Sequence, residues 1–427
     1  MFTKQTIRDI DLKGKTVLLR ADYNVPVEDG KITDDYRIQQ SLPTVKYLLE
    51  QDVKLIICSH LGRPTGRDAS YSLFPVAKRL QQLLDKPVEF ATDCVGEPAK
   101  KAAAGLKTGG VLLLENLRFH PGEKANDAGF AKQLASLAEA YVNDSFGVDH
   151  RADASLEGVT HYLPSVAGLL LEKEMDILTK VMQQPERPLM AIIGGAKIAD
   201  KLEVMNRFIE IADFIAVGGA MANTFLVASG IDTGNSLYDK AEIPVAKDIM
   251  KKAAGESKKR QFVFAIPRDV VVAAKADKTA ATRIVELTVH TMADIQHYPG
   301  RVPANASRIH AREKILDIGP FSASFIAGGV QMVNTVVWSG TMGVTETAGL
   351  QGPIGPFAHG TQTVIEALLG ELGHKPFTVV GGGDTVGYVQ SRNLTAAFNH
   401  VSTGGSASLE VLAGHKLPAV EALLDKK

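Results

Sequence analysis

Short apolar runs rich in β-branched residues recur along the whole chain, and a stretch with helical spacing follows most of them. The runs lie at 16–20, 54–60, 111–119 and 140–146, then at 189–197, 214–222, 261–267, 335–340 and 377–384. Their lengths are typical of strands buried on both faces, and segments such as 130–140 are typical of crossover helices. The pattern predicts an α/β fold with parallel sheets wound on both sides by helices.

The residues that end these strands change character midway along the chain. The early strands end in Arg, His, Asn and Asp, whereas those from residue 189 onward end in paired glycines and Lys. Ligands of open α/β sheets bind outside the carboxyl ends of the strands. We therefore expect two doubly wound, Rossmann-like domains, 1–170 and 171–403, with binding surfaces of different chemistry. A helix predicted within 169–188 connects them, and residues 274–312 have too weak a periodicity to predict an element.

Composition excludes several classes of protein. The 427 residues are 45% hydrophobic and 22% charged, as in ordinary globular domains. Lys and Arg total 47 and Asp and Glu 48, so no global basic excess indicates nucleic acid or an anionic membrane as a partner. No apolar stretch is long enough to span a bilayer. Two cysteines, Cys58 and Cys94, are too few for a disulfide framework or a zinc site built from cysteines, which favours a reducing cytoplasm.

Basic side chains gather at the ends of the early strands. Five arginines and a histidine lie at or near these ends, with an Asp and an Asn after the first strand: Arg20, Arg37, Arg63, Arg118, Arg151, His60, Asp22 and Asn24. Any one arginine alone is more often a solvated surface residue. Parallel strands, however, bring their carboxyl ends to one edge, and guanidinium groups match phosphate and carboxylate oxygens. The set predicts a site for a small, highly anionic substrate.

Glycine-rich turns dominate the second half of the chain. Residues 192–201, with the sequence IIGGAKIADK, place Lys197 and Lys201 just after a Gly-Gly pair, and similar turns lie at 217–225, 379–387 and 401–408. Glycine allows the backbone to approach a nucleotide, and helix N-terminal amides bind phosphate. If residues from 195 onward are helical, the two lysines share a helix face.

A single Gly-Gly pair indicates tight strand–helix packing equally well. The repetition of such turns, one with paired lysines and one with Asp384 as a Mg²⁺ ligand, favours a nucleotide site. Common nucleotide motifs are missing. Asp9 stands where a Walker A motif needs glycine, Gly381–Gly387 lacks the dinucleotide spacing, and protein-kinase signatures are absent.

The order of motifs resembles one family over most of the chain. The motifs LLRADYNVP, SHLGRP, DCVG, ENLRF, YVNDSFG, GGAK, GGAMANTF, VVWSGTMGVTE, GGGD and STGG with ASLE resemble those of phosphoglycerate kinases, from about residue 16 to 423. The resemblance implies an N-terminal phosphoglycerate-binding domain and a C-terminal Mg-nucleotide domain, with a hinge that closes the cleft between them. It also implies that the tail, about 404–427, packs back on the first domain.

The resemblance also implies a reaction and a role for each motif residue. The reaction is reversible phosphoryl transfer from 1,3-bisphosphoglycerate to Mg-ADP, giving 3-phosphoglycerate and ATP, by a cytoplasmic monomer of glycolysis. Substrate would be bound by Arg20, Asp22, Asn24, Arg37, His60, Arg63, Arg118 and Arg151, and catalysis would depend on Arg37, Lys197 and Lys201. The nucleotide would be bound by Gly195, Ala196, Lys201, Gly219, Gly343, Val344, Glu346, Gly382, Gly383, Asp384 and Thr385, with Asp384 also holding Mg²⁺.

Five positions depart from the family pattern and keep two alternatives open. Ser339 and Thr341 stand where the family has Asn and Pro, Asp153 replaces a His beside the basic residues, and Ala220 and Ser406 replace glycines. The alternatives are a non-catalytic relative that binds the same ligands, and a kinase of the same fold acting on another carboxylate. A dinucleotide oxidoreductase is disfavoured, because its fingerprint is absent and a nicotinamide site does not need five arginines.

Overall fold

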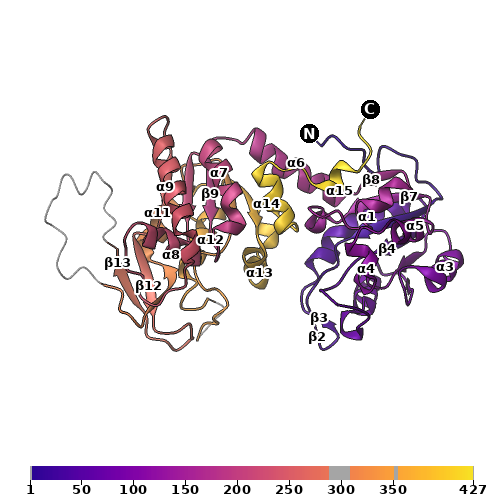
Figure 1. Ribbon diagram of the computed structural model, residues 1–427, viewed down its shortest axis with the longest axis horizontal. Coiled ribbons are helices and arrows are strands. Elements are labelled where there is room, and N and C mark those ends of the chain that lie inside the picture. Colours follow the sequence, from indigo (N-terminus) through magenta and orange to yellow (C-terminus); the bar gives the residue numbers. More distant parts are fainter. Residues whose placement is uncertain (1, 288–307, 351–353, 427) are drawn as a thin grey trace. The chain divides into compact units, whose positions relative to one another are not determined.

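The chain forms two compact α/β units, each built on a six-stranded parallel sheet (Figure 1). The computed structural model describes residues 2–287, 308–350 and 354–426. The first unit comprises Met1–Lys180 with Ser406–Lys427, and the second comprises Val181–Gly405. The predicted fold class, with parallel sheets wound by helices, is confirmed.

The first sheet has the strand order β5-β6-β4-β1-β7-β8. Its strands are β1 (Thr16–Ala21), β4 (Lys54–Cys58), β5 (Val88–Phe90), β6 (Val111–Leu113), β7 (Ala140–Asp144) and β8 (Ser165–Ala167). The helices of this part are α1 (Tyr36–Glu50), α2 (Phe74–Leu84), α3 (Gly96–Gly105), α4 (Pro121–Lys124) and α5 (Ala128–Ala135), and a small hairpin pairs β2 (Val27–Glu28) with β3 (Lys31–Ile32). Alternate strand residues such as Val17 and Leu19 pack in one core with Ile38, Val45 and Leu48 of α1, as expected when successive side chains point to opposite faces.

The second sheet has the order β11-β10-β9-β15-β16-β17. Its strands are β9 (Leu189–Ile193), β10 (Phe214–Val217), β11 (Val263–Ala265), β15 (Thr335–Ser339), β16 (Phe377–Gly381) and β17 (His400–Val401). The helices are α7 (Leu202–Ile211), α8 (Gly219–Ala228), α9 (Ile243–Ser257), α11 (Pro320–Val330), α12 (His359–Leu368) and α13 (Gly383–Ser391). Trp338, the single tryptophan of the chain, is fully buried in β15.

A third, antiparallel sheet was not expected from the pattern. It has the order β13-β12-β14, with β12 (Asp269–Ala273), β13 (Arg283–Glu286) and β14 (Lys314–Ile318). The strand β13 lies inside the segment whose periodicity predicted nothing, and only Val285 of its four residues is buried. Residues 288–307 of that segment lie outside the described residues. The run at 111–119 is also only partly a strand, because β6 ends at Leu113 and a short 3₁₀ turn, η2, spans Leu117–Phe119.

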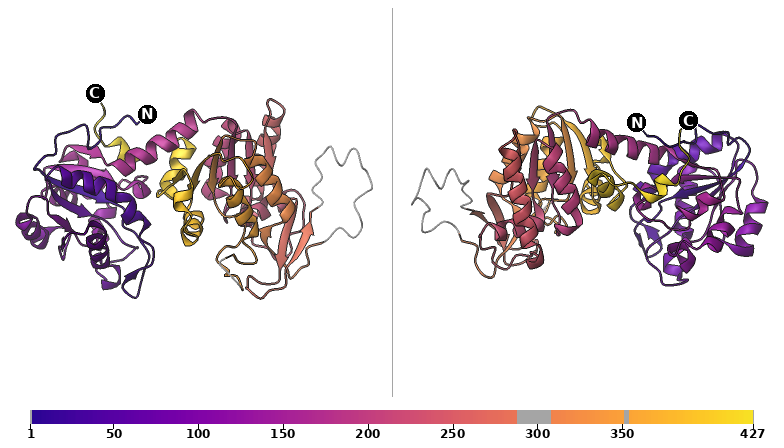
Figure 2. Two further views of the ribbon diagram at one scale, coloured as in Figure 1. Left: turned by 180° about the vertical axis from the view of Figure 1, so that it is seen from behind. Right: turned by 45° about the horizontal axis from the view of Figure 1, so that its top comes forward.

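The two ends of the chain lie side by side at the edge of the first sheet. The predicted connecting helix is present as α6 (Leu169–Gln183), and the chain ends with α14 (Ser406–Ala413) and α15 (Pro418–Glu421). Lys4 forms a β-bridge with Asp425, and the Leu424 amide donates to the Ser165 carbonyl of β8 at 3.0 Å. The yellow tail stays next to the indigo first residues in both turned views (Figure 2). Among the described helices, none is long and apolar enough to cross a membrane.

Candidate active site: an anion patch and a nucleotide pocket

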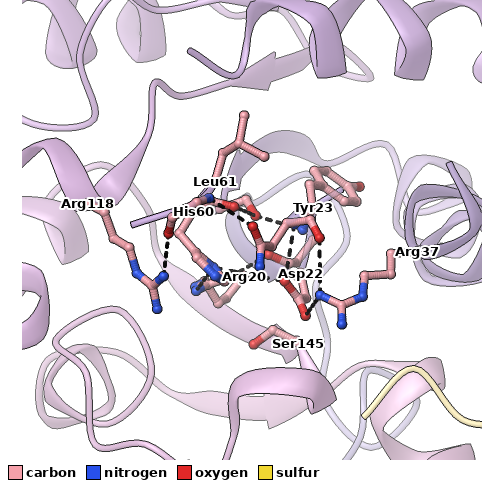
Figure 3. A network of polar contacts seen from close by, with 12 residues as sticks. Arg20, Asp22, Tyr23, Arg37, His60, Leu61, Arg118 and Ser145 are labelled. Atoms are coloured by element: carbon pink, nitrogen blue, oxygen red, sulfur yellow. Dashed lines mark hydrogen bonds and ion pairs between the residues drawn. The ribbon is translucent and has the colours of Figure 1, made fainter. Parts of the chain in front are cut away.

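A network of charged side chains follows three neighbouring strands of the first sheet, β6, β4 and β1 (Figure 3). Arg20 is the next-to-last residue of β1, His60 lies just after β4, and Arg118 lies in η2 after β6. Arg37 joins them from the first turn of α1. Because parallel neighbours end at one edge of the sheet, residues far apart in sequence converge there. We call Arg20, Arg37, His60, Arg118 and Arg151 the anion patch.

His60 lies at the centre of this patch and is neutral. Burial lowers the pKa of its imidazole well below the usual value, and the charges of Arg20, Arg118, Arg151 and Arg37 lower the pKa further. The guanidinium of Arg20 donates to His60 Nδ1 at 3.2 Å. Since arginine only donates, Nδ1 is the acceptor and Nε2 carries the proton. Within the described residues, the buried Nε2 has no hydrogen-bond partner, so it is a donor that an anionic ligand would satisfy.

Arg37 is held toward the patch by Asp22. Arg37 Nη1 lies 2.8 Å from Asp22 Oδ2 and 3.3 Å from the carbonyl oxygen of Asn24. Asp22 is buried, whereas the Arg37 side chain is 31% exposed. The side chain of Asn24 accepts from the Gly62 amide at 2.8 Å, which fixes the loop after β4. Arg37 is therefore oriented by a buried carboxylate while part of its guanidinium faces solvent.

Arg118 contacts the same loop and remains charged. Its Nη1 donates to the Gly62 carbonyl at 2.6 Å, and its buried Nε has no partner within the described part of the chain. Burial, followed by repulsion from Arg151, lowers the pKa of Arg118 to about 10. A group with that pKa is still protonated at neutral pH. Arg118 thus offers an unsatisfied N–H beside the neutral imidazole of His60.

Arg20 is positioned by residues that the sequence did not single out. It is buried, its Nε donates to Ser155 Oγ at 2.9 Å, and Nη1 donates to the carbonyl of Ala21. Ser155 in turn donates to Glu123 Oε1 at 2.6 Å, and the Ser155 amide donates to Oε2 at 3.0 Å. Burial by itself lowers the pKa of Arg20, but the charges around it, that of Glu123 first and that of Asp22 among the others, together raise this pKa above its usual value. With all three guanidinium nitrogens occupied, Arg20 holds His60 in place, and its predicted substrate contact stays a prediction.

Arg63 and Arg151 differ in how closely they join the patch. Arg63 is exposed on the loop after His60, and it is not among the arginines whose charges lower the pKa of His60. Arg151 donates from Nε to His150 Nε2 at 3.3 Å, and its charge acts on both His60 and Arg118. The buried Asp153 acts on Arg118 in the opposite sense.

The glycine-rich loops of the second unit enclose a cavity of about 270 Å³. Seven of the predicted nucleotide-site residues line it: Gly195, Ala196, Gly219, Gly343, Val344, Glu346 and Asp384. Four others, Lys201, Gly382, Gly383 and Thr385, are not part of the lining. The structure adds apolar lining residues, among them Leu237, Val270 and Leu316, which the motifs did not indicate. A flat apolar group with polar atoms at one end fits such a lining.

The glycines of these loops allow close packing between neighbouring loops. Gly195 has a φ of +105° and Gly219 a φ of +64°, which side-chain-bearing residues rarely adopt. A Cβ on Gly219 would lie 2.7 Å from the Gly195 amide nitrogen, closer than real Cβ contacts. The loops after β9 and β10 therefore meet backbone to backbone at the cavity.

The two lysines of IIGGAKIADK occupy different environments. Lys201 donates from Nζ to the carbonyls of Gly194 at 2.6 Å and Ser339 at 2.8 Å. Burial lowers its pKa to about 8, opposed by the charge of Asp384. Lys197 is exposed, and residues 195–198 are not helical, because the chain turns at Gly195 before η5 (Ala199–Lys201) and α7. The expectation of a shared helix face for Lys197 and Lys201 is therefore wrong.

Asp384 and Thr385 lie in the first turn of α13, and their side chains have different surroundings. Asp384 is exposed in the first turn of the helix, lines the cavity and acts electrostatically on Lys201. An exposed carboxylate beside a cavity is the kind of donor that hydrated Mg²⁺ takes, so the residues present fit that ion. Thr385 is buried and accepts from the Gly340 amide at 2.6 Å. Its contact fixes the loop after β15.

Asp317 is a lining residue that the sequence analysis missed. It ends β14 within the unpredicted sheet, and its carboxylate accepts from the amides of Ile318 at 2.9 Å and Gly360 at 2.8 Å. Burial raises its pKa to about 8. Asp317 thereby links the floor of the cavity to the start of α12. A sequence signal would have been an Asp inside the short apolar run 315–318, just before Gly319-Pro320.

Comparison with known proteins agrees with this geometry. The family model described as phosphoglycerate kinase matches residues 7–415. Proteins named phosphoglycerate kinase from Pelotomaculum thermopropionicum and Moorella thermoacetica are each 45% identical, over 99% of this chain and 100% of the relative. A solved phosphoglycerate kinase from Coxiella burnetii has a TM-score of 0.80 and 33% identity, covering 98% of both chains. One from Pyrococcus horikoshii has a TM-score of 0.81 and 30% identity, over 99% of this chain and 98% of that one.

The chain belongs to the phosphoglycerate kinase family. It is accordingly an enzyme of phosphoryl transfer, a kinase of glycolysis that acts on phosphoglycerate substrates with ATP or ADP. The sequence-based assignment of family and reaction is confirmed.

The departures from the family pattern have visible local surroundings. Ser339 Oγ is buried and has no hydrogen-bond partner among the described residues, and a Cβ on Gly382 would lie 3.0 Å from it. Thr341 turns its hydroxyl to the Gly343 carbonyl at 3.0 Å. Ser339 thus leaves an unsatisfied polar atom between the loops that follow β15 and β16.

Proposed function

We propose that this phosphoglycerate kinase binds the phosphoglycerate on the anion patch and Mg-nucleotide in the cavity of the second unit. The observation that supports this most directly is the convergence of four arginines on the neutral His60. Three or more positive charges around one neutral donor suit a ligand with several phosphate and carboxylate oxygens. A neutral imidazole suits the same ligand because it donates from Nε2 without adding charge.

The role of each residue follows from its surroundings. Arg118 and His60 would donate to the anionic end of the substrate, since both have buried N–H groups without partners. Asn24 and Asp22 would shape the opposite side of the patch, where Asp22 already orients Arg37. Arg20 would act mainly by holding His60, and the exposed Arg63 would contact only the outer part of the ligand.

Nucleotide would enter the cavity with its base against the apolar lining. Ala196, Gly219 and Val344 would contact the adenine, and Glu346 would accept from the ribose hydroxyls. The amides of Gly382 and Gly383 at the start of α13 would face phosphate oxygens. Asp384 would hold Mg²⁺, which would neutralise phosphate charge when bound.

Chemistry on these residues needs no general base. The carboxylate of 3-phosphoglycerate is ionised at neutral pH and attacks the γ-phosphorus of ATP directly. Lys201, Lys197 and Arg37 would stabilise the charge on the transferring group, which makes catalysis a matter of positioning and electrostatics. A hinge that brings the two ligands together would also exclude water, which hydrolyses acyl phosphates. We further propose a cytoplasmic, monomeric enzyme.

A coupled assay tests the proposal. Purified protein with Mg-ATP and 3-phosphoglycerate should form 1,3-bisphosphoglycerate, and turnover should vanish when the metal is chelated. Other phosphorylated and plain carboxylates, supplied in parallel, test the altered-substrate alternative that Asp153 keeps open. A folded protein that binds nucleotide but turns over none of these carboxylates would instead support a non-catalytic relative.

A further inference from the structure

Three side chains with metal-binding atoms lie together elsewhere on the first unit. Asp93 and Cys94 form the turn before α3, and His120 directly follows η2. A carboxylate oxygen, the Cys94 sulfur and an imidazole nitrogen all lie within 4.8 Å of one another. Asp93 and Cys94 begin the DCVG motif and His120 directly follows the ENLRF motif, yet phosphoryl transfer as derived above does not use them.

The surrounding contacts fix the side chains of Asp93 and His120 next to each other. His120 Nε2 lies 2.6 Å from Asp93 Oδ1, which also accepts from the Cys94 amide at 2.7 Å. The other oxygen, Oδ2, faces Arg67 Nη1 at 3.4 Å, and Arg67 is fixed by the Thr92 carbonyl at 2.5 Å. The His120 ring packs against Phe130 with ring centroids 5.5 Å apart. Arg67 thus holds the outer oxygen of Asp93 and leaves Oδ1 toward His120.

The donor set selects one kind of ion. Imidazole nitrogen, cysteine sulfur and carboxylate oxygen together suit zinc, whereas Mg²⁺ and Ca²⁺ prefer oxygen ligands alone. Burial raises the pKa of the Cys94 thiol, so the metal would bind its sulfur by displacing the thiol proton into solvent. Zinc is commonly four-coordinate, so three protein ligands leave one position for water. Cys94 is fully buried, while the side chains of Asp93 and His120 are 24% and 32% exposed, so the fourth position would face solvent.

Binding would require a small local movement. In a tetrahedral site with bonds of about 2.0 Å to nitrogen and oxygen, these two ligand atoms lie about 3.3 Å apart. His120 Nε2 and Asp93 Oδ1 would therefore separate by roughly 0.7 Å, and the metal would replace their hydrogen bond. Rotation about the side-chain bonds of two partly exposed residues allows this.

We propose that Asp93, Cys94 and His120 form a zinc site that ties the turn before α3 to the segment after η2. Zinc bound there stabilises the folded first unit by mass action. It also restrains η2, which carries Arg118 of the anion patch two residues before His120. The competing interpretation is that the same contacts are a hydrogen-bonded clasp with no affinity for metal.

Cobalt titration of the purified full-length chain distinguishes the two. Co²⁺ bound by a thiolate gives a near-ultraviolet charge-transfer band that Co²⁺ on oxygen and nitrogen alone does not give. The wild type and the matched control Cys58→Ala, which lacks the only other cysteine, should both show the band and a melting temperature that rises with Zn²⁺. Cys94→Ala should lose both, and His120→Gln should bind Zn²⁺ at least ~100-fold more weakly, beyond the effect of losing an outer-shell partner.

Zinc-edge X-ray absorption of the wild-type chain keeps the proposal testable if a variant fails to fold. One sulfur at about 2.3 Å with nitrogen or oxygen near 2.0 Å is expected. A spectrum without sulfur, a charge-transfer band that survives Cys94→Ala, or no band in the wild type would each overturn the site and leave the clasp. None of these measurements depends on phosphoryl transfer.

Discussion

The anion patch of the first unit and the cavity of the second unit are built in opposite ways for binding anionic ligands. In the patch, charged side chains are held by a buried network, from Glu123 through Ser155 to Arg20 and His60. In the second unit, backbone loops and apolar side chains shape the cavity. The ionisable residues of its lining are Asp317, Glu346 and Asp384, and the half-buried Lys201 and the exposed Lys197 lie in the segment after β9. A buried hydrogen-bonded network holds charged side chains in fixed positions, but burying them costs folding stability. Loops fix the shape of a cavity without burying charge, so the charged side chains around it can move. Variants of the two regions should therefore fail in different ways.

The largest effect is expected from removing the counter-charge of the patch. Glu123→Ala removes the largest of the opposite charges that act on the buried Arg20, and the loss of one member of a buried charge pair costs about 3–5 kcal/mol of unfolding free energy. Because Trp338 reports on the second unit alone, denaturation followed by far-ultraviolet circular dichroism should shift more than Trp338 fluorescence. The control Glu97→Ala removes a side chain that is 92% exposed and should change neither curve. Unchanged stability in Glu123→Ala would mean that the patch is not network-held.

Removing Lys201, the half-buried lysine after β9, should affect turnover and leave the fold intact. Lys201→Ala is expected to lower kcat by about 100- to 1000-fold, as for the loss of one positioned transition-state donor. Steady-state kinetics with saturating Mg-ATP and 3-phosphoglycerate measures this, with circular dichroism as the check on folding. Near-wild-type turnover would remove Lys201 from the proposed chemistry.

Arg37 belongs to the anion patch, but we expect its removal to affect turnover more than stability, as for Lys201. The Arg37 side chain is 31% exposed, so water can reach the buried Asp22 once the guanidinium is removed, and Arg37→Ala should lower the unfolding free energy by only about 1–2 kcal/mol, less than Glu123→Ala does. We expect kcat to fall about 10- to 100-fold, because the lost charge acts on the transferring group. If Arg37→Ala lowered the unfolding free energy by as much as it raised the activation free energy, Arg37 would be a structural residue rather than one that acts on the transferring group.

The pH dependence should be set by the pocket. The pKa of Lys201 is lowered to about 8, so its ammonium form is complete below that pH and is lost above it. The ratio kcat/KM for nucleotide should therefore stay level from neutral pH to about 8 and then fall up to tenfold per pH unit. The neutral His60 has no proton to lose in this range. The same alkaline limb in Lys201→Arg, whose guanidinium does not titrate, would assign it to another group.

The smallest effect is expected from replacing Ser339, whose buried hydroxyl makes no hydrogen bond among the described residues. Ser339→Asn would extend an amide from the loop after β15, where Ser339 Oγ is buried without a partner among the described residues. A rise in kcat of about threefold is expected, equivalent to ~0.7 kcal/mol from one net hydrogen bond. Parallel kinetics on Ser339→Ala serves as the control, since it removes the unsatisfied hydroxyl without adding a donor.

The sequence predicted the two parallel sheets because long apolar runs such as 189–197 leave little choice but a buried strand. It could not predict the antiparallel sheet, because β13 buries only Val285 of its four residues and so lacks the apolar pattern of a buried strand, although its partner β12 directly precedes it in the chain. The convergence of Arg20, His60 and Arg118 followed from the rule for parallel strand ends. Glu123 and Ser155 were missed because nothing local marks a Glu or Ser that meets a buried Arg. The shared face of Lys197 and Lys201 failed because Gly195 turns the chain before the helix begins.

The pairing of the first residues with the tail has a consequence for biosynthesis. The first unit needs Ser406–Lys427, including the bridge from Lys4 to Asp425 and the bond from Leu424 to β8. A ribosome delivers these residues only after the whole second unit has been made. Domains that are continuous in sequence generally fold as they emerge. In this chain the second unit, Val181–Gly405, is completely synthesised before the first unit is. Until Ser406–Lys427 emerge, the β8 edge of the first sheet lacks its contacts with the tail.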